Sequence, residues 1–356
     1  MSRFLSQKFA SIEPYVPGEQ PQGRQYIKLN TNESPYPPAP GVIAAINSEE
    51  VAKLRLYSDP DARPLVAAIA RRFGVGEDQV FVGNGSDEVL AFSFLAFGGE
   101  EKRFRFPALS YGFYPVFARL FGVKYEAVPL RADFTIDPAD YIGCGTNVVL
   151  ANPNAPTGLA LGLDVIEEIL RSNPDSVVVV DEAYVDFGGE SAAKLLEKYD
   201  NLLVVQTFSK SRCLAGMRIG FALGSPDLIG DLQRMKFSFN PYNLDRLAIL
   251  AGTAAMEDEA YLKSCTEKVC ATRRRVTDRL REMGFEVLES KTNFVFAKKP
   301  GLPGTRLFAG LRERGILVRH WDDPLIVDYL RISIGSDAEM DTFLSAVREI
   351  LEEDAK

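Results

Sequence analysis

Hydrophobic residues follow two alternating patterns along the chain: short continuous runs, and longer stretches in which they recur at helical spacing. The continuous runs Val148–Leu150, Val177–Val180 and Leu202–Val205 are typical of strands buried on both faces of a parallel sheet. Helical spacing marks 64–74, which begins with proline and ends with glycine, and 162–171. This alternation predicts an α/β fold with a mainly parallel central sheet between helices.

The pattern changes after about residue 245. A long helical stretch, 245–283, contains the basic run Arg273-Arg274-Arg275, which we interpret as a solvated helix face. Short apolar strands, a helix near 304–314 and a final helix over about 337–353 follow, which predicts a smaller α+β domain. Frequent prolines near the start predict an irregular arm. The predicted organisation is an N-terminal arm over 1–45, a large domain over 46–245 and a small domain over 246–356.

Composition narrows the classes of function. The chain has 356 residues, a single histidine and a formal net charge of −8, with 41 basic and 49 acidic side chains. One histidine excludes a zinc site of the His₂ or His₃ type within one chain, and the acidic balance argues against broad nucleic-acid binding. We therefore predict no metal site and no nucleic-acid partner.

The cysteines and the apolar stretches indicate in which cellular compartment the protein works. Four scattered cysteines without a CxxC pair favour free thiols in a reducing compartment over a disulfide framework. The first residues lack the apolar segment of a secretory signal, and the longest mainly apolar stretch, Val89–Phe97, is far too short to cross a membrane. We expect a soluble, cytoplasmic protein with no membrane partner.

Two polar residues follow predicted strands at the edge where open α/β sheets bind ligands. Asp181 comes directly after a run of valines, so its carboxylate needs a cationic or hydrogen-bonding partner; the alternative is a helix N-cap. Lys210 lies just past another run, among small hydroxyl residues. A partly desolvated amine of this kind forms Schiff bases with carbonyl cofactors, whereas most lysines are simply exposed.

Two loops after other strands carry further candidates. In the loop 83–88, two glycines precede Ser86 and Asp87 at a helix start, where free N–H groups can bind an anion. Simple helix capping by either residue is the alternative. The loop 151–158 has two prolines and a glycine, which fix an irregular backbone that displays asparagine amides. The alternative is that this segment is only a turn.

These features follow one another along the chain in the order loop 83–88, Tyr111, loop 151–158, Asp181-x-x-Tyr184, Ser209-Lys210 and Arg218. Further matching segments are Glu13-Pro14-Tyr15, Leu29-Asn30-x-Asn32-Glu33, Tyr57-Ser58-Asp59-Pro60, Gly315–Arg319 and Tyr329–Gly335. Over nearly the whole chain this order and spacing resemble the fold-type I aminotransferases, which use pyridoxal 5'-phosphate (PLP). The resemblance is closest to the histidinol-phosphate aminotransferase branch.

The resemblance implies a PLP cofactor and a role for each matched residue. Lys210 is the lysine that holds PLP covalently. Asp181 pairs with the pyridinium nitrogen, which keeps the ring able to accept electrons. Tyr184 hydrogen-bonds the phenolic oxygen, and Tyr111 stacks on the ring. The residues implied to bind the phosphate are Gly85, Ser86, Asp87, Thr207, Ser209 and Arg218.

Two more implications concern the assembly and a departure from the family. A tyrosine at the position of Tyr57 reaches the phosphate of the neighbouring subunit in this family, which implies a homodimer with shared active sites. The family usually has an asparagine directly before Pro-Thr-Gly, in contact with the phenolic oxygen, and this chain has Ala155 there. We expect Asn154 to take over that contact; the alternative is that Tyr184 and water carry it.

For the substrate, the resemblance implies that Arg331 binds an anionic end, either a carboxylate or a phosphate. Arg319 and Tyr15 are further candidates for this task, and Asn32 and Asn293 are candidate pocket-lining residues. An ordinary loop residue is the alternative for Arg319 and Asn293.

The implied reaction is the transfer of an amino group from histidinol phosphate to 2-oxoglutarate in histidine biosynthesis. It follows a ping-pong course in which Lys210 moves a proton at the substrate Cα. Threonine-phosphate decarboxylases and aromatic or other amino-acid aminotransferases share these features and are alternatives. A PLP-binding transcriptional regulator is another alternative, but only the short arm precedes the matched segments and the net charge is −8. The last alternative is an α/β scaffold that binds no cofactor.

Overall fold

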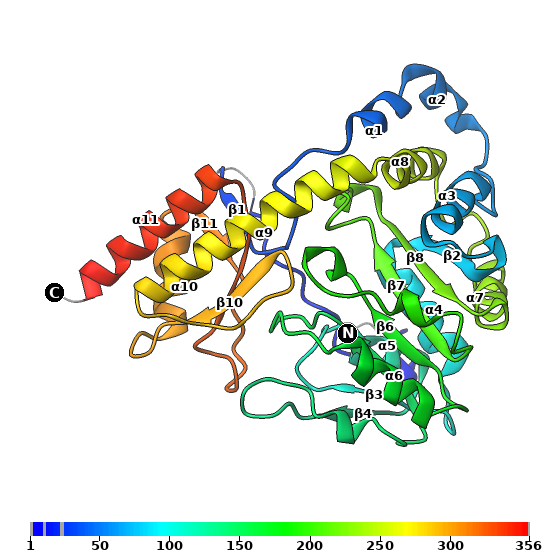
Figure 1. Cartoon of the computed structure of the whole chain (residues 1–356), viewed down its shortest axis with the longest axis horizontal. Coiled ribbons are helices and arrows are strands. Elements are labelled where there is room, and N and C mark those ends of the chain that lie inside the picture. Colours follow the sequence, from blue (N-terminus) through cyan, green and yellow to red (C-terminus); the bar gives the residue numbers. More distant parts are fainter. Residues whose placement is uncertain (1–2, 10–11, 22–24, 355–356) are drawn as a thin grey trace.

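The molecule has a larger part built around a seven-stranded sheet and a smaller part that contains the C-terminal helix, and the long helix α9 (Glu259–Glu282) runs between them (Figure 1). The structure is a computed structural model that describes residues 3–9, 12–21 and 25–354.

The large sheet has the strand order β2-β8-β7-β6-β5-β3-β4. Every strand runs in the same direction except β8, which is antiparallel to both of its neighbours. Ala151, Asp181 and Val205 lie in register on β5, β6 and β7, so these strands reach the same edge. The predicted mainly parallel α/β sheet is confirmed. The strands are β2 (Val80–Asn84), β3 (Phe104–Pro107), β4 (Tyr125–Val128), β5 (Asn147–Ala151), β6 (Val178–Asp181), β7 (Leu202–Thr207) and β8 (Ile219–Gly224).

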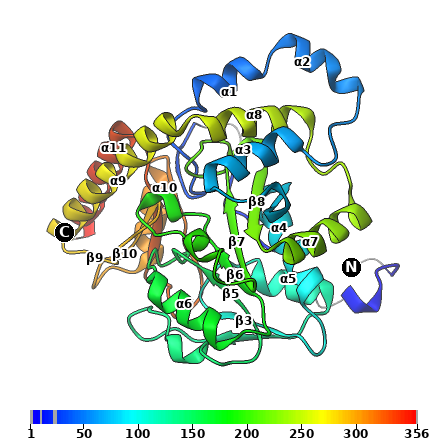
Figure 2. The ribbon, with the colours of Figure 1, turned by 45° about the vertical axis from the view of Figure 1, so that its right-hand side comes forward.

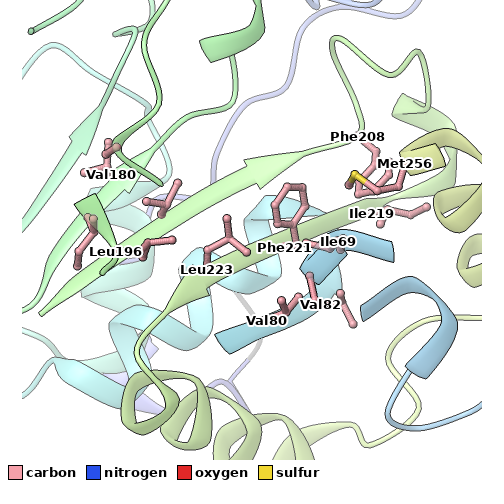
Figure 3. Packing of buried hydrophobic residues seen from close by; sticks show 14 of the residues in the cluster. Ile69, Val80, Val82, Val180, Leu196, Phe208, Ile219, Phe221, Leu223 and Met256 are labelled. Atoms are coloured by element: carbon pink, nitrogen blue, oxygen red, sulfur yellow. The ribbon is translucent and has the colours of Figure 1, made fainter. Parts of the chain in front are cut away.

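Helices cover both faces of this sheet, because alternate strand residues point to opposite sides. Val178 and Val180 pack in one core with α3, α6 and α8, whereas Val179 packs in the other with α4, α5 and α7. Figure 3 shows part of the first core, with Ile69 close to Phe221, and Figure 2 shows α7 and α8 on different sides of the sheet. The helices are α3 (Arg63–Phe73), α4 (Gly85–Phe97), α5 (Tyr114–Phe121), α6 (Leu163–Ser172), α7 (Pro226–Phe239) and α8 (Arg246–Glu257).

The smaller part contains two small sheets and two helices besides α9. Strand β10 lies between β12 and β9, antiparallel to both, and β1 pairs in parallel with β11. Because β1 comes from the predicted arm, that arm is tied to the C-terminal part of the chain. The division into three regions at residues 45 and 245 stays a prediction. The elements are β1 (Ile27–Leu29), β9 (Glu286–Val287), β10 (Phe294–Lys298), β11 (Ile316–Val318), β12 (Leu330–Ser333), α10 (Gly304–Glu313) and α11 (Asp337–Asp354).

Two predictions about the stretch 245–283 are wrong in detail. It forms two helices that meet at Asp258, whose side chain caps α9 by accepting a hydrogen bond from the Tyr261 N–H. Arg273 is not on a solvated face. It is 8% exposed and donates to the carbonyl oxygens of Phe187 (2.9 Å) and Thr292.

The remaining elements are short. Helices α1 (Pro40–Ala45) and α2 (Ser48–Ala52) lie at the outside of the larger part (Figure 1). Among the residues that the structure describes, no helix combines the length and apolar character needed to cross a membrane. The 3₁₀ turns are Gln7–Phe9, Lys53–Arg55, Glu77–Gln79, Pro138–Asp140, Val185–Phe187, Ala192–Leu195 and Ala215–Met217.

Candidate active site

A cavity of about 420 Å³ lies at the carboxyl ends of β5, β6 and β7. Because these three strands end in register, the residues that follow them converge on this edge of the sheet. The cavity brings together many of the residues predicted from the sequence, namely Ser86, Asp87, Tyr111, Asp181, Tyr184, Thr207, Ser209, Lys210 and Arg218.

Lys210 faces this cavity from the loop after β7. Its Nζ donates to the Thr31 carbonyl oxygen at 3.3 Å and lies 5.9 Å from the centre of the Tyr184 ring. Burial, and to a smaller extent the charge of Arg331, lower the pKa of this amine to about 8. Compared with an ordinary lysine, more of this amine is therefore uncharged near neutral pH and able to attack a carbonyl or accept a proton.

Asp181, at the end of β6, is 4% exposed. Its carboxylate accepts hydrogen bonds from the Tyr114 hydroxyl at 2.8 Å and from the Ala183 N–H at 3.2 Å. Burial raises its pKa to about 6, and these hydrogen bonds oppose that rise. No basic side chain in the described part of the chain forms an ion pair with Asp181. The site therefore favours a ligand that brings a cationic N–H to this carboxylate.

The first turn of α4 forms another wall of the cavity. Asp87 accepts hydrogen bonds from the Tyr111 hydroxyl at 2.6 Å and from Arg218 Nη2 at 2.9 Å, and Arg218 Nη1 donates to Ser209 Oγ at 3.4 Å. The helix N-cap is Asn84, whose side chain makes no capping hydrogen bond, so capping by Ser86 or Asp87 is not found. The first N–H groups of a helix lack intrahelical partners and suit an anion, with Arg218 beside them.

Two glycines allow close packing around this helix end. A Cβ on Gly220 of β8 would lie 2.2 Å from the Ser86 nitrogen, and one on Gly85 would lie 2.6 Å from Arg218 Nη2. Gly85 also has a φ of +79°, in the left-handed region that glycine adopts most easily. Gly85 thus shapes the space between the helix end and Arg218 without a side chain of its own.

A second cavity of about 410 Å³ adjoins the first, and Lys210 lines both. The two cavities also share Thr31, Tyr111, Ala155 and Tyr184. The second one is lined by the predicted substrate residues Tyr15, Arg319 and Arg331, and also by Trp321 and Asn30.

Arg331 provides a positive charge in the second cavity. Its Nη2 donates to the Asn30 carbonyl oxygen at 2.8 Å, and its guanidinium carbon lies 5.4 Å from the ring centres of both Phe294 and Trp321. Its buried Nε has no hydrogen-bond partner among the described residues. Burial lowers the pKa of this guanidinium. An anionic ligand here would satisfy a group that is otherwise costly to bury.

Arg319 makes different contacts. Its guanidinium donates to the carbonyl oxygens of Val16 at 3.0 Å and Pro17 at 3.2 Å, so it holds the backbone of the N-terminal arm. The same arm carries Tyr15, whose ring stacks on Phe113 with 4.3 Å between ring centres. The arm therefore lies at the second cavity, with Arg319 attaching it.

Asn32 and Asn293 lie behind the cavities. Asn32 Nδ2 donates to the Tyr184 hydroxyl at 2.9 Å, and Asn32 Oδ1 accepts from the Ser333 hydroxyl at 2.8 Å. Asn293 Nδ2 donates to the Asn32 carbonyl oxygen at 2.9 Å. Neither residue is among those that line the two cavities, so their contacts orient Tyr184 and do not reach the cavity space.

The structure corrects the expectation for Asn154. Its Oδ1 accepts from Ser110 Oγ at 2.7 Å, and its Nδ2 donates to Leu109 O at 3.1 Å and Thr157 Oγ1 at 3.2 Å. Asn154 does not line either cavity, whereas Ala155 lines both. Since the loop uses both ends of the Asn154 amide, the alternative contact through Tyr184 has the better geometry.

Tyr57 lies outside both cavities of its own chain. Its side chain is 80% exposed and its ring stacks on Tyr242, with 4.5 Å between ring centres. Within one chain it therefore contacts no other predicted site residue.

The site residues that are absent from the sequence-based candidates include Tyr114, Thr31 and Trp321. Tyr114 opens α5, and its ring centre lies 5.7 Å from that of Tyr111, but its contact with Asp181 comes from a distant strand that the sequence does not place beside it. Thr31 acts through its backbone oxygen, which no residue type reveals.

Comparison with known proteins identifies the class. The family described as "Aminotransferase class I and II" matches residues 24–347. The chain belongs to this aminotransferase family.

Individual relatives are more specific. The chain is 55% identical to histidinol-phosphate aminotransferase 2 of Dechloromonas aromatica over 354 residues, which cover 98% of this chain and 99% of the relative. It is 50% identical to the histidinol-phosphate aminotransferase of Clostridium acetobutylicum over 351 residues, covering 99% of this chain and 100% of the relative. The crystal structure of the Sinorhizobium meliloti histidinol-phosphate aminotransferase in complex with pyridoxal-5'-phosphate is similar, with a TM-score of 0.88, 26% identity and 99% of each chain covered.

Proposed function

We propose that this protein transfers the amino group of histidinol phosphate to 2-oxoglutarate, which gives imidazole acetol phosphate and glutamate, in histidine biosynthesis. The observation that carries the proposal is the identity of 55% and 50% to two histidinol-phosphate aminotransferases over nearly the whole chain. The second cavity supports it, since the cation of Arg331 and the rings of Tyr15 and Trp321 lie around it.

The residues of the first cavity fit PLP. Asp181 offers a buried carboxylate that has no basic partner in the described ranges of the chain, which suits a protonated pyridine nitrogen. The first turn of α4, Ser209 and Arg218 lie together and suit a phosphate, with charge-assisted hydrogen bonds of ~1.5–3 kcal/mol each. Bound PLP would supply an electron sink for the charge that develops at the substrate Cα.

Lys210 would hold the cofactor covalently through its amine, which an amino donor would set free by taking its place. The free Nζ would remove a proton from the substrate Cα and give it back later, which an amine with a pKa of about 8 can do near neutral pH. Its position on the wall between the two cavities gives it access to both reacting partners. Hydrolysis by water would release the donor as a carbonyl compound and leave its nitrogen in the site, and the acceptor keto acid would take up that nitrogen and release water in the second half of the cycle.

Tyr184 takes the contact to the phenolic oxygen of PLP, and Asn32 holds its hydroxyl in place at 2.9 Å. Ala155 leaves this position without an amide. Tyr111 would stack on the cofactor ring, and its hydroxyl donates to Asp87.

Arg331 binds the anionic end of the substrate, a carboxylate of glutamate or the phosphate of histidinol phosphate. Arg319 holds the arm over the second cavity, and Tyr15 packs its ring at the substrate. Thr207 supports the phosphate site through Ser209, to which its hydroxyl donates at 3.0 Å.

The assembly we propose is a homodimer in which Tyr57 reaches the phosphate bound by the neighbouring subunit. Its exposure of 80% and its absence from the cavities of its own chain support this role. A cytoplasmic location stays a prediction.

The purified enzyme tests the substrate. Glutamate, histidinol phosphate, phenylalanine and threonine phosphate are added separately, and the cofactor absorbance is followed. Glutamate and histidinol phosphate are expected to convert the cofactor to its amino form, and 2-oxoglutarate to reverse the change. Conversion by glutamate without turnover of histidinol phosphate would contradict the proposed substrate. Release of carbon dioxide from threonine phosphate would favour the decarboxylase alternative.

A further inference from the structure

A polar cluster outside both cavities connects the first turn of α4 to the segment that carries Tyr57. Its centre is Glu88, whose Oε2 accepts hydrogen bonds from the Asn84 N–H at 2.7 Å and from Asn243 Nδ2 at 2.6 Å. Gly83 lets the start of α4 pack closely on β2, because a Cβ there would lie only 2.8 Å from Val89 Cγ2. Glu88 thus ties Asn243 to the helix turn that contains the proposed phosphate site.

The residues on either side of Asn243 extend this connection to Tyr57. The Leu244 carbonyl oxygen accepts a hydrogen bond from the Ser58 hydroxyl at 2.5 Å. The Tyr242 ring stacks on Tyr57 at an interplanar angle of 22°. The exposed Tyr57 ring is therefore held mainly by the segment 242–244. Glu88 anchors that segment through Asn243, whose Nδ2 also donates to the Val82 carbonyl oxygen at 3.3 Å.

Lys236 completes the cluster from α7. It is 1% exposed, and its Nζ donates to the Pro60 carbonyl oxygen. Burial lowers its pKa, and the charges of Asp61, Glu88 and Asp59 oppose this. The buried Lys236 ammonium therefore attaches Pro60, which lies three residues after Tyr57, to the same cluster.

We propose that Glu88 is a positioning residue that couples the phosphate site of its own subunit to Tyr57, and thereby to the PLP phosphate of the neighbouring subunit. This inference rests on the proposed function, in which PLP is the cofactor and the dimer shares its sites. The physical reason is that Glu88 gives Asn243 a charge-assisted hydrogen bond from the rigid start of a helix. Without it, the 242–244 segment loses its link to α4, and the stacked Tyr57 ring loses its fixed direction.

Hybrid dimers separate the effect on the neighbouring site from any effect within one subunit. One subunit carries Lys210→Ala and its partner keeps Lys210, so the covalent PLP chromophore forms in one site only. The phosphate in that site is contacted by Tyr57 of the Lys210→Ala subunit. Glu88→Ala, Asn243→Ala or Tyr57→Phe is then added to the Lys210→Ala subunit, and the dissociation constant for PLP is measured by absorbance titration.

We expect Tyr57→Phe in the Lys210→Ala subunit to weaken PLP binding about tenfold, as for the loss of one charge-assisted hydrogen bond. Glu88→Ala and Asn243→Ala in the same subunit should each weaken it by a similar factor. Combining Glu88→Ala with Tyr57→Phe should add little to either change alone, because both act through one contact.

Two outcomes would overturn the inference, and they differ in whether the shared active site also fails. If Tyr57→Phe weakens PLP binding in the neighbouring site but Glu88→Ala does not, Glu88 does not position Tyr57 and the shared site stands. If neither has an effect, the shared site fails as well, while a chromophore that depends on Lys210 still supports the aminotransferase. Glu88→Gln guards against misfolding, because its amide oxygen can accept both hydrogen bonds without the negative charge, so a partial effect is expected. Glu100→Gln, at a side chain that is 86% exposed, is the matched control and should change nothing.

Discussion

At the scale of single residues, burial does most to adapt ordinary side chains to the proposed chemistry. It lowers the pKa of Lys210 to about 8 and raises that of Asp181 to about 6. The sequence could indicate both, since each follows a buried strand. It could not indicate that Tyr114 bonds Asp181 or that Ser110 and Leu109 occupy the Asn154 amide, because these partners come from a different loop.

The first prediction concerns Lys210. Lys210→Ala should lower kcat by about 10²–10⁴, because it removes the group that moves the proton at the substrate Cα. It should also abolish the covalent PLP absorbance, and both are read in the same cuvette. Lys263→Ala, at a side chain that is 77% exposed, is the control and should behave as the unmodified protein. Unchanged turnover in the Lys210 variant would refute the assigned role.

The second prediction uses Glu182, which the reaction does not need. It accepts hydrogen bonds from Ser191 Oγ and the Ala192 N–H, both at 2.6 Å, and from Gln206 Nε2 at 2.8 Å, and burial raises its pKa to about 7. Between the unfolded value of 4.5 and about 7, the folded protein keeps a proton that the unfolded chain has lost. The free energy of unfolding should therefore fall as pH rises through this range, by ~3 kcal/mol in total from this group.

Urea unfolding of the cofactor-free protein at intervals between pH 5 and pH 8 checks this sign. Glu182→Gln removes the titrating group, so its stability should depend less on pH over the same range, even if it is lower throughout. An equally steep fall in the variant would show that Glu182 is not its source.

At the scale of elements, the contact between β8 and the start of α4 determines the proposed phosphate site. The third prediction is that Gly220→Ala destabilises the protein by about 1–3 kcal/mol, because its Cβ would lie 2.2 Å from the Ser86 nitrogen. It should also weaken PLP binding, because the first turn of α4 must move. Gly230→Ala, on an exposed helix position with nothing within 4 Å of the added Cβ, should instead stabilise it by about 0.5–1 kcal/mol. Thermal unfolding and PLP titration measure both.

In helix α9 the spacing of the buried residues indicates the environment of Arg273 better than its charge does. Arg273 lies in one stripe with the buried residues Val269, Val276 and Leu280, at spacings of four, three and four. That phase places it on the buried face, although a run of three arginines favours solvent. The run alone therefore gave the wrong environment for its first member and the right one for Arg274, which is exposed.

The fourth prediction follows from this environment. Arg273→Ala should cost about 2–4 kcal/mol of stability, because the carbonyl oxygens of Phe187 and Thr292 lose their donor. Arg274→Ala should stay within ~0.5 kcal/mol. Urea unfolding of the two variants side by side measures the difference, and equal stabilities would contradict the role given to Arg273.

At the scale of the whole molecule, the strand and helix patterns were enough to predict the parallel sheet and its helical layers. They were not enough to predict that β1 leaves the arm and pairs with β11, because three residues carry no periodicity that can be distinguished from a loop. Long-range pairing depends on where both strands end in space, and a local pattern does not contain that information.

The fifth prediction concerns the dimer. The segment 43–57 exposes large apolar side chains, which is typical of an interface: Ile43, Val51, Leu54, Leu56 and Tyr57. We expect Leu54→Glu and Leu56→Glu to shift the protein from dimer to monomer in sedimentation experiments and to lower activity with it, because Tyr57 then has no neighbouring site. Leu325→Glu, at a side chain that is 60% exposed in the smaller part, should leave the dimer intact. A dimer unaffected by either change in the segment would place the interface elsewhere.

The pairing of β1 with β11 also has a consequence for biosynthesis. The ribosome makes Ile27–Leu29 about 290 residues before their partners, which corresponds to a delay on the order of 15–60 s at ~5–20 residues per second. During that time Thr31 and Asn32, which contact Lys210 and Tyr184, have no strand to fix them. The nascent chain can thus complete its large sheet early, but it can assemble the full set of site contacts only near the end of translation.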